Sequence, residues 1–423
     1  MSKWEKVKLK DIIEFTISGE WGYEPKQSEF SLVLRSTNFT DFGVIDYSDI
    51  ASRFVPESIL NKKRIKKGYL LVEKSGGSDK KPAGRVVYCD KDFEGTCSNF
   101  IEIVKINDKY DSKYILYFFL NNYHSGRLNK YQQQTTGIIN FKFNEYLEEF
   151  CFLPIDKSIQ SRIAEILTTA DKAIEESEKL IAKYKRMKTG MMQDLLTKGI
   201  DENGNIRSEA THKFKDSPLG RIPVEWEVKR LEEVCIYVSD GSHFSPKARE
   251  EGFVIGNVKD MEEFDFNYNS CTKISIRDYE VLVSQNCQPL KGDILLSKDG
   301  TIGKVFVFNK DKKIVILSSI AILRPSDKYS SLYLSYLLKS QYFNKNLIKF
   351  ISGSALKRIV IRDIKKMIFP LSSDEREQNR ICDYLSEIDS LVFVETETLS
   401  KLKRLKAGLM NDLLSGKVEV VDN

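Results

Sequence analysis

Two lysines and two glycines recur with the same spacing in two parts of the chain, and this combination suits phosphate binding. The pattern K-G-x-[LI]-L-x-x-K-x-G occurs at residues 67–76 and again at residues 291–300. In each copy an apolar strand ends in a glycine-containing loop, where the backbone can approach a phosphate closely and the second lysine supplies charge. A basic residue follows shortly afterwards, Arg85 in one copy and Lys304 in the other. The alternative is that the glycines only form β-turns and that the lysines are solvated.

These loops supply most of the residues that we expect to contact DNA. The guanidinium of Arg85 could form a two-pronged contact with a guanine edge in the major groove. A polar glycine loop at residues 239–243 suits a base contact or a plain turn equally well. The predicted DNA-binding residues are Lys74, Ser75, Gly76, Gly77, Arg85, Ser242, His243, Lys298, Asp299, Thr301 and Lys304.

Sequence motifs for catalysis or for a bound cofactor are absent. Residues 300–304 (GTIGK) are too short for a P-loop, and Val305 follows where a hydroxyl residue would stand. There is no Gly-x-Gly-x-x-Gly loop, and no Asn-Pro-Pro-aromatic tetrapeptide of the kind that DNA methyltransferases place on a target base. The seven cysteines form no Cys-x-x-Cys pair, and the three histidines are scattered. We predict no catalytic residue, no metal site and no cofactor bound by this chain.

Composition places the chain among ordinary globular proteins. Of its 423 residues, 41% are hydrophobic and 30% are charged, which is enough apolar mass for more than one core. Lys and Arg (66) barely exceed Asp and Glu (61), so a nucleic-acid surface has to be a local patch. No apolar run approaches the roughly 20 residues that span a bilayer, and the first residues carry no apolar signal core. We expect a cytoplasmic protein.

The chain contains an internal repeat. Residues 160–167 (QSRIAEIL) return as residues 378–385 (QNRICDYL), and at the same spacing residues 194–196 return as residues 412–414. The repeated lysine loops, and a Trp-Glu pair that begins each copy, follow in the same order. A gapless match of this length indicates a tandem duplication.

Each copy ends in a predicted long helix whose apolar residues recur at alternating steps of four and three, which is typical of a coiled coil. Polar residues interrupt both series at corresponding positions, Ser177 and Lys188 in the first and Glu395 and Lys406 in the second. We predict that the helices pair antiparallel and bury each other's seam. The alternative is that each helix packs only on its own globular half. The predicted seam, which we also assign to partner binding, includes Ile163, Leu167, Ile174, Ile181, Leu195, Ile381, Leu385, Val392, Leu399 and Leu413.

The predicted fold is α+β, with two globular target-recognition domains separated by two long antiparallel coiled-coil helices that are related by a pseudo-two-fold repeat. Glycines after each helix and a polar stretch rich in glycine and proline mark the boundaries. The predicted parts are a first globular domain (1–155), a central helix (156–200), a linker (201–223), a second globular domain (224–371) and a C-terminal helix (372–418).

Several stretches have wording that is specific to one protein family. They are residues 160–196 and their copy at 378–414, which end in GMMQDLL and GLMNDLL, the linker 217–226 (SPLGRIPVEW) and the strand–loop 292–304. In these motifs and in the order of its parts, the whole chain resembles the specificity (S) subunit of type I restriction–modification systems.

The resemblance implies a non-catalytic DNA-recognition subunit. Each globular half would read one part of a split, asymmetric DNA target, and the paired helices would set the gap and dock two methyltransferase (M) subunits. Restriction (R) subunits would then attach, and S-adenosylmethionine, ATP and magnesium would belong to those partners. Helices of about 40 residues are about 60 Å long, which exceeds one DNA turn of about 34 Å. A stand-alone enzyme and a scaffold that does not bind DNA are the two rival classes.

Overall fold

The chain forms two compact units, each built from segments that are distant in sequence. The computed structural model describes residues 4–25, 30–78, 81–135, 137–350 and 358–420. Unit 1 comprises residues 1–179 and 396–423, and unit 2 comprises residues 180–395. Unit 1 therefore contains the first globular half together with the last part of the chain.

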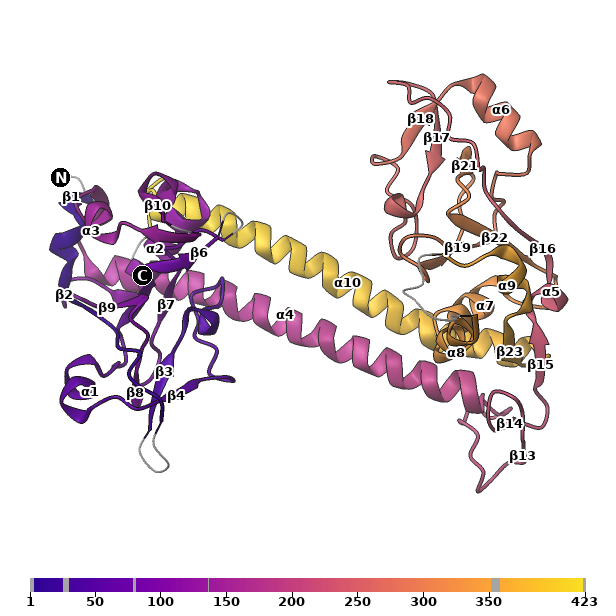
Figure 1. Ribbon diagram of the computed structural model, residues 1–423, viewed down its shortest axis with the longest axis horizontal. Helices are drawn as coiled ribbons and strands as arrows, with labels where there is room; N and C mark the ends of the chain where they lie inside the picture. Colours follow the sequence, from indigo (N-terminus) through magenta and orange to yellow (C-terminus); the bar gives the residue numbers. More distant parts are fainter. Residues whose placement is uncertain (1–3, 26–29, 79–80, 136, 351–357, 421–423) are drawn as a thin grey trace. The chain divides into compact units, whose positions relative to one another are not determined.

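Unit 1 is built around a four-stranded antiparallel sheet. The strands of unit 1 as a whole are β1 (Trp4–Lys8), β2 (Ile13–Ser18), β3 (Ser31–Leu34), β4 (Ala51–Arg53), β5 (Leu70–Glu73), β6 (Ser75–Gly77), β7 (Val86–Tyr88), β8 (Gly95–Cys97), β9 (Ile101–Ile106), β10 (Gln132–Thr135), β11 (Ile138–Phe141) and β12 (Phe150–Pro154). Its short helices are α1 (Glu57–Lys63), α2 (Ser112–His124) and α3 (Phe143–Leu147), with 3-10 turns η1 (Leu9–Ile12), η2 (Ser36–Asn38) and η3 (Arg127–Tyr131). The main sheet has the order β2-β9-β5-β7, of which β2, β9 and β7 are labelled in Figure 1. Smaller sheets have the orders β4-β3-β8, β10-β11-β6 and β1-β12, and β3 runs parallel to β8.

Three of the four sheets of unit 1 have counterparts in unit 2 among the described residues. The strands of unit 2 are β13 (Phe214–Lys215), β14 (Ile222–Pro223), β15 (Glu227–Arg230), β16 (Cys235–Asp240), β17 (Phe253–Gly256), β18 (Thr272–Ile274), β19 (Ile294–Ser297), β20 (Val305–Val307), β21 (Ile314–Ile316), β22 (Ile320–Pro325) and β23 (Ile368–Leu371). Its short helices are α5 (Leu231–Val234), α6 (Ile276–Ser284), α7 (Ser331–Leu338), α8 (Gln341–Phe350) and α9 (Ile361–Lys366), with the 3-10 turn η4 (Val258–Asp260). The sheets β16-β22-β19-β20, β18-β17-β21 and β15-β23 have the same strand orders as their counterparts in unit 1, and β17 runs parallel to β21. This correspondence confirms the predicted duplication and the α+β class.

The strand before each lysine loop is buried on both faces. In β5, Leu70 packs into a core with α2, while Leu71 faces a second core under the neighbouring sheet. In β19, Ile294 and Leu295 divide between two cores in the same way. A strand enclosed on both faces reads as a nearly continuous apolar run, as these two do. The loops that follow are therefore anchored to rigid elements.

The two long helices pair antiparallel within each unit (Figure 1). These helices are α4 (Lys157–Lys198) and α10 (Glu375–Leu414). In unit 1, Leu413 near the end of α10 shares a core with Ile163 near the start of α4. In unit 2, Leu195 near the end of α4 shares a core with Leu385 near the start of α10. The predicted antiparallel pairing is confirmed, and packing of each helix on its own half alone is excluded because both cores contain residues of both helices.

Each long helix ends at a glycine that packs against a tryptophan. Gly199 and Gly416 have φ values of 68° and 72°, which favour glycine over other residues. A Cβ atom on Gly199 would lie 2.6 Å from the ring of Trp226, and one on Gly416 would lie 2.9 Å from the ring of Trp4. The Trp-Glu pair that begins each copy thus supplies the same contact in both units.

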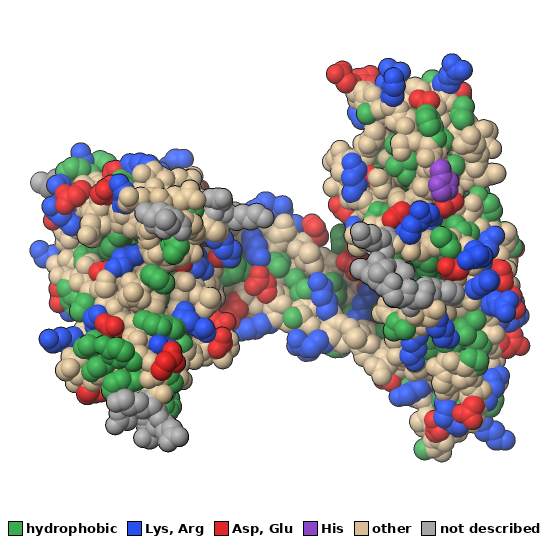
Figure 2. Space-filling model, viewed as in Figure 1, with side chains coloured by type: hydrophobic (Ala, Val, Ile, Leu, Met, Phe, Trp, Pro, Cys, Tyr) green, Lys and Arg blue, Asp and Glu red, His purple; other side chains and the backbone are tan. Residues whose placement is uncertain are grey.

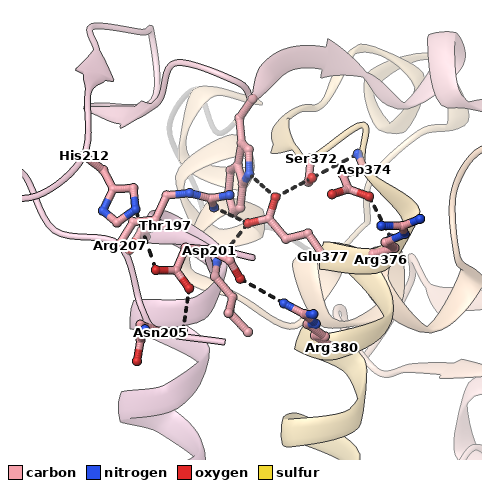
Figure 3. A network of polar contacts seen from close by, with 12 residues as sticks. Thr197, Asp201, Asn205, Arg207, His212, Ser372, Asp374, Arg376, Glu377 and Arg380 are labelled. Carbon is pink, nitrogen blue, oxygen red and sulfur yellow. Dashed lines mark hydrogen bonds and ion pairs between the residues drawn. The ribbon is translucent and has the colours of Figure 1, made fainter. Parts of the chain in front are cut away.

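The linker docks on the start of α10 through one buried carboxylate, Glu377 (Figure 3). Glu377 accepts hydrogen bonds from the indole N–H of Trp226 (3.0 Å) and the backbone N–H of Ile200 (2.9 Å), and it forms an ion pair with Arg207. Arg380 donates to the carbonyl oxygens of residues 201 and 202. These contacts hold the linker to unit 2, where it forms a small hairpin of β13 and β14.

The described residues contain neither a membrane-spanning helix nor a cluster of metal ligands. Within the described ranges, no helix is long and apolar enough to cross a membrane. In the same part of the chain, no group of three or more His, Cys, Asp or Glu side chains has the geometry to hold a metal ion. All seven cysteines are free thiols.

Candidate nucleic-acid interface

The lysine loop of unit 1 is held in place by a neighbouring carboxylate. The Nζ atom of Lys74 lies 2.5 Å from Glu102 of β9 and also contacts the hydroxyl of Ser18 at the end of β2. The Lys74 side chain keeps 26% of its surface exposed. Ser75 is buried, whereas Gly76 is exposed with a φ of 104° that favours glycine. The exposed surface of this loop is therefore largely backbone.

Arg85 stabilises the end of β5, directly before the lysine loop. Its guanidinium forms a two-pronged ion pair with Glu73, at 2.9 Å from Nε and 2.8 Å from Nη2. It also donates to the backbone carbonyls of Ser36 (3.0 Å) and Phe39 (3.2 Å), around η2. The hydrogen bond to Glu73 raises the pKa of Arg85 above its usual value. Since Glu73 is only 1% exposed, Arg85 neutralises a carboxylate that water cannot reach.

Lys304 makes the corresponding contact in unit 2. Its Nζ atom donates to the backbone carbonyls of Val258 (3.2 Å) and Met261 (2.8 Å), around the turn η4. No carboxylate corresponds to Glu73, because Ser297 occupies the matching position of the repeat. Both basic residues thus tie the main sheet to a 3-10 turn of the neighbouring sheet.

The lysine loop of unit 2 is more deeply enclosed than that of unit 1. The Lys298 side chain is only 3% exposed, and its Nζ atom lies 3.0 Å from Asp240 at the end of β16. Its backbone N–H donates to the carbonyl of Ser319 (2.9 Å). Asp299 is half-buried and Thr301 is exposed at the tip of the loop. The hydroxyl and backbone at the tip, rather than the lysine, face solvent.

The second predicted loop of unit 2 meets the lysine loop at Asp240. Ser242 is buried, and its hydroxyl bonds to the backbone of Phe244. His243 is exposed, with its Nε2 atom 3.6 Å from the carboxylate of Asp240. Because Asp240 also contacts Lys298, the structure brings the two loops of unit 2 together.

Each unit therefore gathers its own set of predicted residues. Unit 1 brings together Lys74, Ser75, Gly76, Gly77 and Arg85, and unit 2 brings together Ser242, His243, Lys298, Asp299, Thr301 and Lys304. The four basic side chains all have partners within the protein, and the exposed groups are Gly76, His243 and Thr301. DNA contact by any of these residues stays a prediction.

Sequence reasoning missed the carboxylates that hold the basic residues. Glu73, Glu102 and Asp240 do not recur at matching positions of the two copies, so the repeat gave no signal for them. Asp240 lies inside the loop 239–243, but only Ser242 and His243 of that loop were predicted to contact DNA.

Charges of both signs alternate over the surface. Figure 2 shows Lys and Arg side chains interspersed with Asp and Glu on the visible face of each unit. This distribution agrees with the expectation that a DNA surface is local, since the formal net charge is only +5.

The helix residues assigned to partner binding lie inside the helix pair and the two cores. All of them are buried except Leu399, which is half-buried. Apolar residues on the outer faces of the helices are exposed instead, among them Met187, Phe393 and Leu405. A partner that docks on the helices would meet these outer faces rather than the seam.

Comparison with known proteins identifies the family to which the chain is related. A family model described as the type I restriction modification DNA specificity domain matches residues 1–185 and residues 223–404. The chain belongs to this family. The specificity domain therefore occurs twice. Each match covers one globular half and part of the long helix that follows it.

Individual relatives agree with the family match. The MjaVIII specificity subunit of a type I restriction enzyme from Methanocaldococcus jannaschii is 28% identical over 330 residues, which cover 75% of this chain and 73% of that protein. The S subunit of a type I restriction–modification system from M. genitalium has the same fold, with a TM-score of 0.60 and 15% identity over 97% of this chain and 96% of that one. A chain from a structure on complex assembly and conformational transition of the type I R-M system aligns with a TM-score of 0.54 and 18% identity over 98% of both chains.

Replacement of Arg85 by alanine should strongly destabilise unit 1 of this specificity subunit. The change leaves the buried Glu73 carboxylate unpaired, which costs about 3–5 kcal/mol. Chemical denaturation of the full chain measures the loss, and Lys81→Ala, at an exposed site in the same unit, serves as the control. The double variant Glu73→Leu/Arg85→Met should recover most of the stability. An Arg85→Ala variant as stable as the wild type would contradict the bracing role.

Proposed function

We propose that this chain is the non-catalytic DNA-recognition subunit of a type I restriction–modification complex. Each recognition domain reads one half of a bipartite, asymmetric DNA target. The paired helices set the spacing of the half-sites and dock two M subunits, and R subunits join through them. S-adenosylmethionine, ATP and magnesium are bound by those partners, and the complex works in the cytoplasm.

One observation carries this proposal: the same strand order presents different loops in the two units. The basic residue is Arg85 in one loop and Lys304 in the other. Arg85 forms an ion pair with a buried carboxylate, whereas Lys304 donates to a backbone carbonyl. His243 adds an exposed imidazole to the loop of unit 2, whereas Trp21 occupies the matching position of the first copy. Because base readout depends on individual donors and acceptors, two different loops favour two different half-sequences.

In this proposal the lysines of the two loops supply phosphate contacts, and Lys298, whose side chain is only 3% exposed, has to be released from Asp240 to do so. Both are held by carboxylates, so a phosphate would share the ammonium group or displace the carboxylate. The phosphate contacts fix the register of the protein on DNA, and the exposed groups at the loop tips read base edges.

Neutralising both lysines should reduce the salt dependence of DNA binding. In Lys74→Gln/Lys298→Gln, each lost phosphate contact lowers the slope of log K against log salt by about 0.9. Titration of target DNA at several salt concentrations, with the M subunits present, measures this slope. The matched variant Glu102→Gln/Asp240→Asn removes the carboxylate partners and should keep the full slope. An unchanged slope in the lysine variant, with the fold intact, would remove these lysines from the interface.

Changes at the loop tip of unit 2 should affect one half of the target only. His243→Ala and Thr301→Val each remove an exposed hydrogen-bonding group, and the loss of a base contact costs about 1–3 kcal/mol of discrimination. Competition with DNA variants mutated in one half-site or the other reads out the effect. Lys310→Ala, an exposed change elsewhere in unit 2, is the control. Equal loss of discrimination in both half-sites would contradict the assignment of one half-site to each unit.

A further inference from the structure

Each unit contains a largely buried group of one tyrosine, one aspartate and one lysine, and the aspartate and lysine come from the two paired helices. In unit 1 the hydroxyl of Tyr117 on α2 donates to Asp171 on α4 (2.8 Å), and Lys406 on α10 forms an ion pair with the same carboxylate. The Asp171 and Lys406 side chains are 16% and 11% exposed. We call this group triad 1.

Unit 2 contains the same group with the roles of the helices exchanged. The hydroxyl of Tyr336 on α7 donates to Asp389 on α10 (2.9 Å), and Lys188 on α4 forms the ion pair. The Asp389 and Lys188 side chains are 10% and 17% exposed. We call this group triad 2, and in both triads the lysine comes from the other copy of the repeat.

A single antiparallel register satisfies both ion pairs. Asp171 precedes Lys188 along α4 by the same number of residues as Asp389 precedes Lys406 along α10. Lys188 and Lys406 interrupt the otherwise apolar seam, and Asp171 and Asp389 lie beside it. Charged groups in a helix seam contribute more to the choice of register than to stability, because their desolvation offsets much of their attraction.

Other registers of the same seam leave these charges without partners. A slip of one heptad would place Asp171 opposite Leu399 or Leu413 instead of Lys406. The carboxylate of Asp389 would likewise face apolar seam residues. A buried carboxylate without its cation is strongly unfavourable, so a slipped register loses both ion pairs at once.

We propose that triads 1 and 2 are positioning groups that select one register of the α4–α10 pair and thereby fix the DNA spacer length that this subunit accepts. The second part of this inference rests on the proposed function of the helices as the spacer. A slip of one heptad moves one helix along the other by about 10 Å, which corresponds to about three base pairs.

The test replaces both triads by apolar residues of similar size. The apolar variant carries Asp171→Leu, Lys406→Met, Asp389→Leu, Lys188→Met and phenylalanine for both tyrosines. The matched control exchanges the charges within each pair (Asp171→Lys with Lys406→Asp, and Asp389→Lys with Lys188→Asp), which keeps the preference for one register. If the apolar variant does not fold, Asp171→Lys alone and its rescue by Lys406→Asp take its place.

Register is read directly by cross-linking in the full chain. Glu178 and Lys403, whose side-chain atoms lie 2.7 Å apart in unit 1, are replaced by cysteines and treated with a short bismaleimide. Peptide mass spectrometry then quantifies the α4–α10 cross-link. We expect efficient cross-linking in the otherwise native chain and in the charge-exchanged control, and a loss of at least threefold in the apolar variant. Equal cross-linking in all three would overturn the proposal.

Spacer length is read separately from the methylated motif of the assembled complex. We expect one spacer length for the native chain and for the control, and additional lengths for the apolar variant. A loss of the cross-link with the spacer unchanged would uphold the selection of register and contradict the spacer role of the helices. The two parts of the inference therefore fail independently.

Discussion

The antiparallel pairing of α4 and α10 is the constraint on which both units depend. Leu413 completes the core of unit 1, and Leu195 completes that of unit 2, so each unit requires the end of a helix that begins in the other. The apolar area buried in this way is the main favourable term in forming the cores. As a result, the two copies of the repeat are not structurally independent domains.

The pairing of α4 and α10 also determines where the two lysine loops lie in their units. The helix ends pack under the main sheet of each unit, the central strand of that sheet is buried on both faces, and the lysine loop leaves its end. Carboxylates then hold the basic side chains, Glu73 with Arg85 and Asp240 with Lys298. Such fixed side chains lose little entropy on binding, which favours specific recognition over loose attraction.

Much of the architecture could be predicted because it leaves a repeated signal. The duplication, the α+β class and the antiparallel helices follow from matched residues and from heptad spacing. The sequence also shows Lys188 and Lys406 as polar interruptions of the seam, but it did not predict the ion pairs that they form. The partners themselves could not be predicted, because Asp171 and Asp389 lie beside the apolar series rather than in it. The roles of Arg85 and Lys304 as braces depend on contacts with η2 and η4, which are remote in sequence and leave no pattern.

In the proposed function, this chain selects the DNA sequence on which its complex acts. Genome-wide mapping of adenine methylation, in cells that express its M subunit with and without this chain, tests it most directly. We expect a split, asymmetric motif that appears only when the chain is present. If the M subunit co-purifies with the chain and yet no motif depends on it, the chain does not specify the target.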